Sequence, residues 1–572
     1  MAWLTTTARG IGGVGSSRLN GSETNAVARP FASRGSWAKI ASAAIIALVA
    51  VALRCWHLDW GLATDARHLA FPDEPISWGP YVHDFIPLRW ASFDRESLNY
   101  PPFYGYVVGL TAWTLNALGW LATPPAAPPM FWVPPSAVLL ARAVSVAASL
   151  VTIALVGLAA GRMYSARTGW LAAALMAVVP FEVVYVHVAS PDILLATGTL
   201  LTTFLAYRLA LHGGGGTAFA AGIAAGMTTG TKYTGLAIVV AIAWAVGERL
   251  KVERAWRRAA MLAALAATGF ALAGVIACPP CVLHSDRLAF ALQNHLQINW
   301  KLFDHFHNNY LVPSLGWYGR PYAYQLVASL PFTLGWPLYA AALLGIGIAI
   351  RRHTLADRIL LLAFIPYFLV MARSMLTFPR FLLPLLPILV ILAARGFDVW
   401  APQRLRPVLL ASVWIYSLAL GATQVARFSL DQQRDVAQWI AKAPPRTAYT
   451  GQVRVGVPKM ILDYFRLAKP FKAANLKPVE LDDGAWFTPV SPEYFVLPDW
   501  YAIAIERDIP DSPAARDLAR LRSGEAGYDR VAEWRSSYLQ QRLYTSLDPA
   551  FAGDLWQGEI GFTVYARRAT RG

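Results

Sequence analysis

The sequence predicts an α-helical polytopic membrane protein with about 11 spans, followed by a small C-terminal α/β domain. Of its 572 residues, 56% are hydrophobic and only 15% are charged, and the mean hydropathy is +0.41. A soluble protein of ordinary composition carries about 25% charged residues. Apolar runs recur up to Gln424, many of them close to the roughly 20 residues that a helix needs to cross a bilayer, and after that residue the hydropathy drops.

The expected spans follow from the length of each apolar run and from the charge of the loops beside it. Two of the runs are short and flank Lys232. We interpret residues 102–121, although apolar, as an interfacial or re-entrant helix on the outer side, because the proline-rich loop after it carries no charge. The expected spans are residues 38–56, 137–160, 168–186, 193–211, 217–231, 233–247, 259–277, 336–350, 359–372, 381–394 and 407–424.

The distribution of charge orients these spans. The net charge is +16, and Lys and Arg fall mostly in short loops between apolar runs, such as residues 249–258. This is the positive-inside pattern of membrane proteins and not a surface for nucleic acid. It predicts a multi-pass protein of the plasma (inner) membrane with a cytoplasmic N-terminus and an extracytoplasmic C-terminal domain.

The chain is expected to have three parts. Residues 1–37 are rich in Gly, Ser and Arg and are expected to form a disordered cytoplasmic tail. Residues 38–425 form the transmembrane catalytic domain, with outer loops at 57–136 and 278–335. Residues 426–572 form a soluble extracytoplasmic α/β domain.

Within the last part, local patterns predict particular elements. Residues 431–440 have the pattern of an amphipathic helix, and residues 493–497 and 561–566 are short apolar runs typical of strands.

The three cysteines exclude a disulfide framework. Cys278 and Cys281 have the spacing of half a metal or redox site, but no second pair completes a zinc site. We interpret the pair as a loop turn, oxidised if it lies outside. The histidines of the second outer loop have no metal-type spacing and are expected to have ordinary surface roles.

An acidic pair, Asp73 and Glu74, follows the first apolar run within Phe-Pro-Asp-Glu-Pro. Carboxylates beside a bilayer are costly to place and often functional. Asp, Glu and Pro also suit helix starts, so the local sequence fits a solvated capping turn equally well.

With the predicted topology, further polar residues gather at the outer face. Asp192 begins one span, Lys232 lies between the two short runs, and Arg380 flanks another span. Each has an ordinary alternative: Asp192 caps its helix, and the basic residues snorkel to the interface. For Arg142, inside its span, the ordinary alternative is a pair with a carboxylate such as Glu182. Acids and bases at the ends of separate spans on one face favour a site.

The chemistry that these residues fit is group transfer from an anionic lipid. A carboxylate can deprotonate an incoming hydroxyl, and Lys and Arg can neutralise a phosphate leaving group. The sequence has no Gly-x-Ser-x-Gly elbow and no nucleotide phosphate loop. The carboxylates Asp73, Glu74 and Asp192 also offer oxygen ligands to a divalent metal, although neither carboxylate role needs one.

Several motifs in order resemble the polytopic GT-C glycosyltransferases of the protein O-mannosyltransferase and lipid A aminoarabinose transferase group, which depend on phospholipid carriers. The resemblance covers about residues 38–400. The matching elements are Pro72-Asp73-Glu74, Tyr100-Pro101-Pro102, Arg142, Pro191-Asp192, the segment from Gly226 to Lys232, and the Pro-Arg-Phe-Leu-Leu-Pro-Leu-Leu-Pro run at 379–387.

The resemblance implies a GT-C-like fold and transfer of a sugar from a polyprenyl-phosphate donor on the outer face, with inversion at the anomeric carbon. It implies that Asp73, supported by Glu74, is the catalytic carboxylate. It implies that Asp192 and Tyr100 bind the acceptor or organise the site. It also implies that Lys232 and Arg380 bind the donor phosphate.

This sequence also departs from the family pattern. A basic residue sometimes precedes the Pro-Pro element in the aminoarabinose branch, and here Asn99-Tyr100 stands there. The large luminal insertion frequent in the mannosyltransferase branch is absent. The acceptor, a hydroxyl of a glycan, lipid or protein, therefore stays open.

Two alternatives come from other classes. A transporter or flippase of lipid-linked glycans would need polar residues in both halves of the bilayer, and here they crowd one face. A non-catalytic membrane scaffold that binds cell-envelope glycan would leave the acidic pair unexplained.

Overall fold

The computed structural model describes residues 34–62, 77–86, 93, 98–122, 135–300, 321–374, 378–430, 432–443, 452–458, 462, 465, 471, 474–481, 486–487, 491–508, 510–535 and 561–568. The chain divides into two compact units, Met1–Ile45 and Ile46–Gly572. The expected tail falls largely outside the described residues, and helix α1 (Arg34–Cys55) begins before residue 38.

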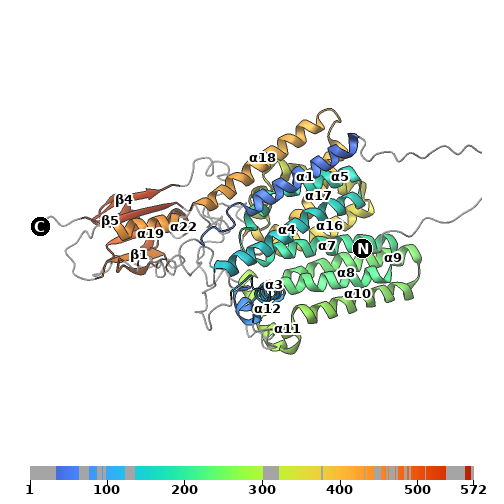
Figure 1. Ribbon diagram of the computed structural model, residues 1–572, viewed down its shortest axis with the longest axis horizontal. Coiled ribbons are helices and arrows are strands. Elements are labelled where there is room, and N and C mark those ends of the chain that lie inside the picture. The colour runs from blue at the N-terminus through green and yellow to red at the C-terminus, as the bar shows by residue number, and fades with distance from the viewer. Residues whose placement is uncertain are drawn as a thin grey trace, which may run out of the picture. The chain divides into compact units, whose positions relative to one another are not determined.

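Helices make up most of the second unit (Figure 1). In chain order the elements after α1 are α2 (Gly79–Phe85), α3 (Phe103–Ala117), α4 (Pro135–Met163), α5 (Ala166–Ala177), α6 (Pro180–Tyr185), α7 (Pro191–His212), α8 (Gly215–Thr231), η2 (Tyr233–Ile238), α9 (Val239–Glu253), α10 (Trp256–Ala277), α11 (Pro279–Leu283), α12 (Ser285–Trp300), α13 (Pro321–Tyr324), η5 (Gln325–Ser329), α14 (Leu330–Leu334), α15 (Trp336–Arg352), α16 (Leu355–Ala372), η6 (Pro379–Leu385), α17 (Leu386–Trp400), α18 (Arg406–Ala426) and η7 (Arg427–Ser429).

Local sequence explains where several helices begin and end. Ser165 caps α5 by accepting a hydrogen bond from the backbone N–H of Thr168. Thr354 and Asp357 form a reciprocal capping box at the start of α16. Helix α7 ends at Gly213, whose φ of +65° is a left-handed conformation that glycine adopts without steric cost.

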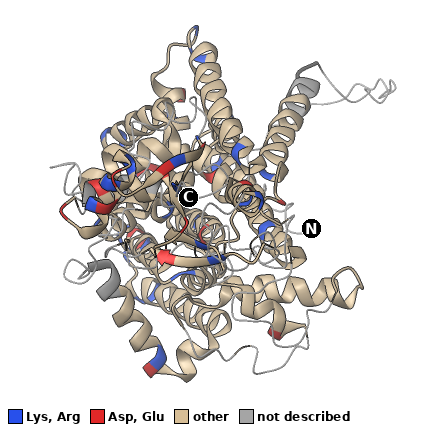
Figure 2. Cartoon of the chain, turned by 90° about the vertical axis from the view of Figure 1, so that its left-hand side faces the viewer, with Lys and Arg blue, Asp and Glu red and all other residues tan. Residues whose placement is uncertain are grey.

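The helices identify a multi-pass membrane protein. In the described part of the chain, six helices are long and apolar enough to cross a membrane, and a seventh is added if the pair Tyr322–Leu334 and Trp336–Arg352, bent by 118°, is one span. In Figure 2 the helices carry few charged residues over most of their length. The finer prediction of about 11 spans is not confirmed, because expected spans such as α5 and α9 are only 12 and 15 residues long.

Helices α7, α8 and α10 lie side by side (Figure 1), and glycines bring α8 and α10 close together. A Cβ atom on Gly222 would lie 2.0 Å from the carbonyl oxygen of Ala266, and one on Gly226 would lie 2.5 Å from that of Phe270. Small residues at such crossings let helix backbones approach within a membrane. The glycines that precede Lys232 therefore fix the position of α8, at whose end Lys232 lies.

Polar contacts near the helix termini fall into two groups, which we name the site end and the basic end. At the site end, Asp192 at the start of α7 pairs with Lys232 after α8. The C-terminal end of α10 also lies at the site end. Cys278, between α10 and α11, packs there against Leu98.

At the basic end, the contacts join the loops with the most Lys and Arg. Glu248 near the end of α9 pairs with Lys251 and with Arg358 of α16. Glu253, also on α9, pairs with Arg258 at the start of α10. Asp192 and the basic loop therefore lie at different ends of the helices. The sequence predicts that the end with the basic loop is cytoplasmic.

The C-terminal part of the chain forms a five-stranded sheet in the order β2-β1-β3-β5-β4. Strand β1 is parallel to β2 and β3, and β5 is antiparallel to β3 and β4. The elements are α19 (Gln432–Lys442), β1 (Arg454–Pro458), β2 (Lys477–Leu481), β3 (Tyr494–Pro498), α22 (Asp499–Asp508), α23 (Pro513–Ser523), β4 (Tyr528–Trp534) and β5 (Phe562–Arg567).

The central strand β3 is buried on both faces. Tyr494 and Val496 pack with α19, and Phe495 and Leu497 pack with α22 and α23. A strand covered on both sides reads as a continuous apolar run, as Tyr-Phe-Val-Leu does here. The expected helix near 431–440 and the two expected strands are found at α19, β3 and β5.

Candidate functional site

The acidic pair Asp73 and Glu74 lies outside the described residues. The structure does describe the two flanks of the segment that carries it. One flank runs from the end of α1 to residue 62, and the other begins at Ser77 and continues into α2.

Asp192 and Lys232 form a buried ion pair. Lys232 Nζ donates to Asp192 Oδ1 at 2.7 Å, and the two side chains, Lys232 and Asp192, are 13% and 4% exposed. The other carboxylate oxygen, Oδ2, accepts a 2.7 Å hydrogen bond from the hydroxyl of Ser190, the N-cap residue of α7. Asp192 therefore holds Lys232 with one oxygen while the other is tied to the start of its own helix.

Two aromatic rings flank the ammonium group of Lys232. Its Nζ lies 5.4 Å from the ring centre of Phe381 and 6.0 Å from that of Tyr100. The backbone of Lys232 is extended between α8 and η2, which directs the chain from one helix into the next. Cation–π contacts of this kind hold a lysine in place while leaving its N–H groups available.

Arg380 directly precedes Phe381 in the chain. It is half-buried in η6, and its guanidinium carbon is 4.4 Å from the ring centre of Phe378. Phe378 in turn makes an edge contact with Phe381, at 5.8 Å between ring centres. The structure thus links Arg380 to Lys232 through two phenylalanine rings.

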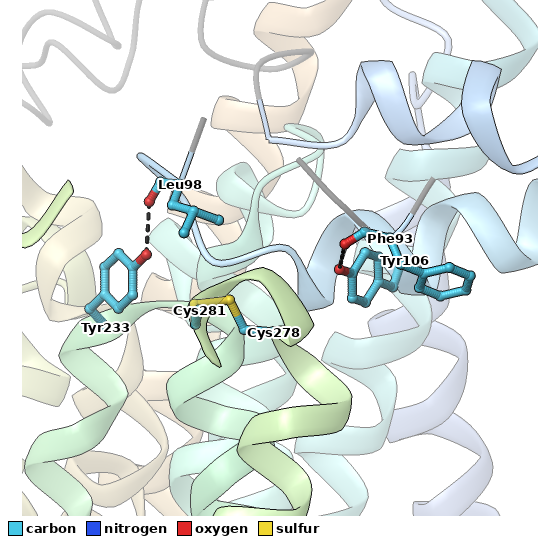
Figure 3. Close-up of a disulfide and its surroundings, with 6 residues drawn as sticks. All are labelled: Phe93, Leu98, Tyr106, Tyr233, Cys278 and Cys281. Carbon is cyan, nitrogen blue, oxygen red and sulfur yellow. Dashed lines mark hydrogen bonds between the residues drawn. A yellow bond between two sulfur atoms is a disulfide. The ribbon is translucent and has the colours of Figure 1, made fainter. Parts of the chain in front are cut away.

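Tyr100 belongs to a second layer of rings that includes His295 of α12. His295 makes edge contacts with Tyr100 and Tyr233, at 6.5 and 5.8 Å between ring centres, and its Nε2 is hydrogen bonded to the carbonyl of Asn99. Tyr233 donates a 2.8 Å hydrogen bond to the carbonyl of Leu98 (Figure 3). Sequence reasoning did not identify His295 as part of this ring layer, because its contacts join segments that are distant in the chain and no residue spacing indicates them.

A disulfide joins Cys278 and Cys281 beside this layer (Figure 3). Cys278 is buried against Leu98 and Ala291, so the bridge fixes the turn between α10 and α12 where it meets the segment before Tyr100. The interpretation of this pair as an oxidised turn agrees with the structure. Disulfides persist in oxidising compartments.

Glu182, the carboxylate named as a possible partner of Arg142, pairs with another residue. Glu182 pairs with Arg54 of α1, and this carboxylate also accepts a hydrogen bond from Ser149. Arg142 donates hydrogen bonds to the backbone carbonyls of Leu58 and Trp60, both at 2.8 Å. Arg54 is the nearer guanidinium because the end of α1 packs where α5 turns into α6, and the carbonyls of Met176 and Ala177 accept its remaining N–H groups.

The described residues contain no group of three His, Cys, Asp or Glu side chains placed to hold a metal ion. Asp192 contributes one carboxylate, and its oxygens already accept hydrogen bonds from Lys232 and Ser190. Asp73 and Glu74, the other oxygen ligands considered from the sequence, are outside the described part of the chain.

Comparison with known structures returns ArnT and an oligosaccharyltransferase. ArnT from Cupriavidus metallidurans in the apo state is 16% identical, with a TM-score of 0.46 over 83% of this chain and 95% of that chain. The same protein bound to undecaprenyl phosphate is 16% identical, with a TM-score of 0.46 over 94% and 99%. The Archaeoglobus fulgidus oligosaccharyltransferase in the apo form is 14% identical, with a TM-score of 0.47 over 87% and 74%.

Sequence comparison gives a more local result. No curated protein matches the chain. Residues 137–273, about a quarter of the chain, match the family model described as dolichyl-phosphate-mannose-protein mannosyltransferase. This segment contains Arg142, Asp192 and Lys232, and over its length the resemblance to the polytopic glycosyltransferases of the protein O-mannosyltransferase group is confirmed.

Proposed function

We propose that this protein is a glycosyltransferase that moves a monosaccharide, hexosyl or pentosyl, from a polyprenyl-phosphate donor to an acceptor hydroxyl at the outer face of the membrane. The acceptor belongs to a glycan, a lipid or a protein. The observation that carries the proposal is the buried Asp192–Lys232 pair between two aromatic rings, inside the segment that matches the family model.

The geometry of Lys232 suits the neutralisation of a leaving phosphate. An ammonium group has three N–H donors, and the carboxylate of Asp192 accepts one of them. The remaining donors can bind a phosphate oxygen. Arg380 lies close to this ammonium group, because it contacts the ring of Phe378, which contacts the ring of Phe381 beside Lys232. In a poorly solvated site these charges stabilise the developing phosphate more strongly than they would in water.

In the proposed reaction, the acceptor oxygen attacks the anomeric carbon from the side opposite the phosphate. The bond from this carbon to the phosphate oxygen breaks, and polyprenyl phosphate leaves with the electron pair, so that the configuration inverts. The hydroxyl proton passes to Asp73, which acts as general base with Glu74 beside it. Asp192 and Tyr100 organise the site around Lys232.

Two features of the structure support the proposed orientation. A disulfide lies at the site end, which favours an oxidising compartment there. The basic loop between α9 and α10 lies at the opposite end, as the positive-inside rule requires of a cytoplasmic loop. We therefore propose the plasma (inner) membrane as the location, with the N-terminus in the cytoplasm and the sheet domain outside.

The test is transfer by the purified full-length protein. Polyprenyl-phosphate sugars are offered with glycolipid and peptide acceptors, and wild type is compared with Asp73→Asn. Loss of a general base lowers the turnover rate about 10² to 10⁴-fold, so we expect at least a hundredfold loss with the fold intact. The matched control is Asp59→Asn, an exposed carboxylate in the same outer segment.

Three results would contradict the proposal. Turnover of Asp73→Asn at the wild-type rate would remove the base role. Transfer from a nucleotide sugar without any polyprenyl-phosphate sugar would remove the donor assignment. Movement of the labelled lipid across a vesicle bilayer, without any transfer, would instead identify a flippase.

A further inference from the structure

The short segment that carries Tyr100 is held by side chains from two distant parts of the chain. Tyr233 donates a 2.8 Å hydrogen bond to the carbonyl of Leu98 (Figure 3), and Nε2 of His295 is hydrogen bonded to the carbonyl of Asn99. Because a carbonyl oxygen only accepts, this nitrogen of His295 carries the proton and donates. The two carbonyls just before Tyr100 are therefore bound, one from η2 and one from α12.

The segment has few means of holding itself in place. Residues 98–102 lie outside any helix. Two of them, Pro101 and Pro102, have no backbone N–H group, so neither can donate to a carbonyl of the segment. Leu98 is 2% exposed, and a backbone carbonyl that is removed from water needs a hydrogen bond partner. The hydroxyl of Tyr233 supplies that partner.

Helix α12 presents one face to this segment. Ala291 is 1% exposed and packs with Leu98 and Cys278, and Leu288 packs against the same cluster. Residues 288, 291 and 295 are spaced by three and four, so their side chains lie on one face of the helix. The disulfide of Cys278 fixes the turn between α10 and α12. The helix face and the disulfide together place His295 against the segment.

Tyr233 and His295 also connect the segment to the ammonium group of Lys232. Tyr233 directly follows Lys232 in the chain, and the ring of His295 makes edge contacts with the rings of Tyr233 and Tyr100, at 5.8 and 6.5 Å between centres. The ring centre of Tyr100 lies 6.0 Å from Lys232 Nζ. A cation–π contact extends to about 6 Å, so a small outward shift of Tyr100 would remove it.

We infer that Tyr233 and His295 are positioning residues, which hold Tyr100 beside Lys232 and thereby set the affinity of its ammonium group for the phosphate of a polyprenyl-phosphate ligand. Their role rests on the proposed function, because that function assigns the phosphate to Lys232. Neither residue belongs to a motif. Phe381, the second ring beside the ammonium, lies on η6 and is not held by these bonds, so losing them weakens phosphate binding without abolishing it.

The variant Tyr233→Phe removes the hydroxyl and keeps the ring. Its matched control is Tyr106→Phe, because Tyr106 also donates at 2.8 Å to a backbone carbonyl of the first outer segment, that of Phe93 (Figure 3). Both variants lose the same kind of bond, so we expect similar melting temperatures. We expect the Kd of the purified full-length protein for undecaprenyl phosphate to rise about threefold to tenfold in Tyr233→Phe only, within the worth of one cation–π contact.

Two variants of His295 separate its hydrogen bond from its ring. His295→Phe keeps a flat ring without a donor, and His295→Gln keeps an N–H donor at a similar reach. We expect the Kd to rise in His295→Phe and to stay near the wild-type value in His295→Gln. Equal Kd values for these two variants would overturn the role of His295. A Kd for Tyr233→Phe equal to that for Tyr106→Phe would overturn the role of Tyr233.

Transfer kinetics give a readout that a purely structural role would not produce. In Tyr233→Phe and His295→Phe we expect the KM for the lipid donor to rise with the Kd, and kcat to change less than about threefold. The reason is that losing a contact made equally with the bound substrate and with the transition state raises KM alone. A lower kcat with an unchanged KM would contradict the positioning role.

The binding measurement separates the positioning role from the proposed function. If the variants bind undecaprenyl phosphate more weakly while wild type transfers no sugar, the positioning role stands and the transferase activity fails. If wild type transfers sugar while all the variants bind as wild type does, the proposed function stands and the positioning role fails. If wild type does not bind undecaprenyl phosphate, the positioning role also fails, because it requires a phosphate at Lys232.

Discussion

At the residue scale, the charge of Lys232 is held in a mostly buried position by its neighbours. Removing a charge from water is costly, and a buried pair offsets this cost only when its geometry is good. Asp192 provides that geometry at 2.7 Å, and it is itself held by Ser190. Rings on two sides of the ammonium keep it from swinging away. This preorganisation is what the proposed binding of a phosphate by the remaining N–H groups requires.

His187 predicts a pH dependence of stability. It lies in the connection before α7, and burial, followed by the nearby Arg142 and Arg54 charges, lowers its pKa to about 4, although its two carbonyl neighbours act in the opposite direction. The unfolded chain binds this proton near pH 6.5 and the folded chain does not. Stability is therefore expected to fall as the pH decreases from about 6.5 to about 4, by roughly 3 kcal/mol.

The measurement is thermal unfolding in detergent over this pH range, comparing wild type with His187→Gln. The glutamine amide donates a hydrogen bond and does not titrate, so its curve should be flatter between about pH 6.5 and about pH 4. Parallel curves for the two proteins would show that His187 does not contribute. A wild type that gains stability relative to the variant as the pH falls would mean that the folded chain binds the proton more tightly, the opposite of the expected direction.

At the scale of elements, the crossing of α8 and α10 controls where Lys232 lies. We expect Gly222→Ala to destabilise the protein by roughly 1 to 3 kcal/mol, because the new Cβ would meet the Ala266 carbonyl at 2.0 Å and backbone atoms cannot rotate away. The matched control is Gly247→Ala in α9, where a Cβ meets nothing within 4 Å. That variant should be neutral or slightly more stable, since alanine favours helix. Equal melting temperatures for the two variants would contradict this account.

Sequence reasoning found the helices but not the contacts between them. Helix starts such as Thr354–Asp357 and breaks such as Gly213 have local causes, so their residues can be read from the chain. The partner of Glu182 could not be read, because the sequence offers both Arg54 and Arg142 and only the packing of α1 shows that Arg54 reaches this carboxylate. The length test for spans also depends on packing, since short helices are tolerated where neighbours cover their ends.

The same limit applies to the site. Asp192 and Lys232 were predicted to lie at one face from topology, and the structure places them in contact. Their roles in the reaction stay predictions, and Asp73 and Glu74 lie outside the described residues. Trp60, Trp78 and His295 are hydrogen bonded to backbone carbonyls of distant segments, and such partners leave no mark on spacing or composition.

At the scale of the whole molecule, the proposed orientation predicts which exposed positions a membrane-impermeant reagent reaches. Leu118, just after α3, and Leu405, just before α18, are 57% and 56% exposed. Each is replaced by cysteine in a Cys55→Ser background, which removes the one free thiol among the described residues. With α3 on the outer side and the loop before α18 inside, an impermeant maleimide added to intact cells should label Leu118→Cys and not Leu405→Cys.

Disruption of the membrane should then expose Leu405→Cys to the reagent, which controls for its reactivity. The position of α3 decides the result at Leu118: its 15 residues extend about 22 Å, less than the roughly 30 Å of a bilayer core. An outer helix of this length keeps both of its ends on the side of Tyr100, whereas a crossing helix would carry Leu118 to the cytoplasm. Labelling of Leu405→Cys alone in intact cells would therefore invert the orientation, and labelling of neither would make α3 a span.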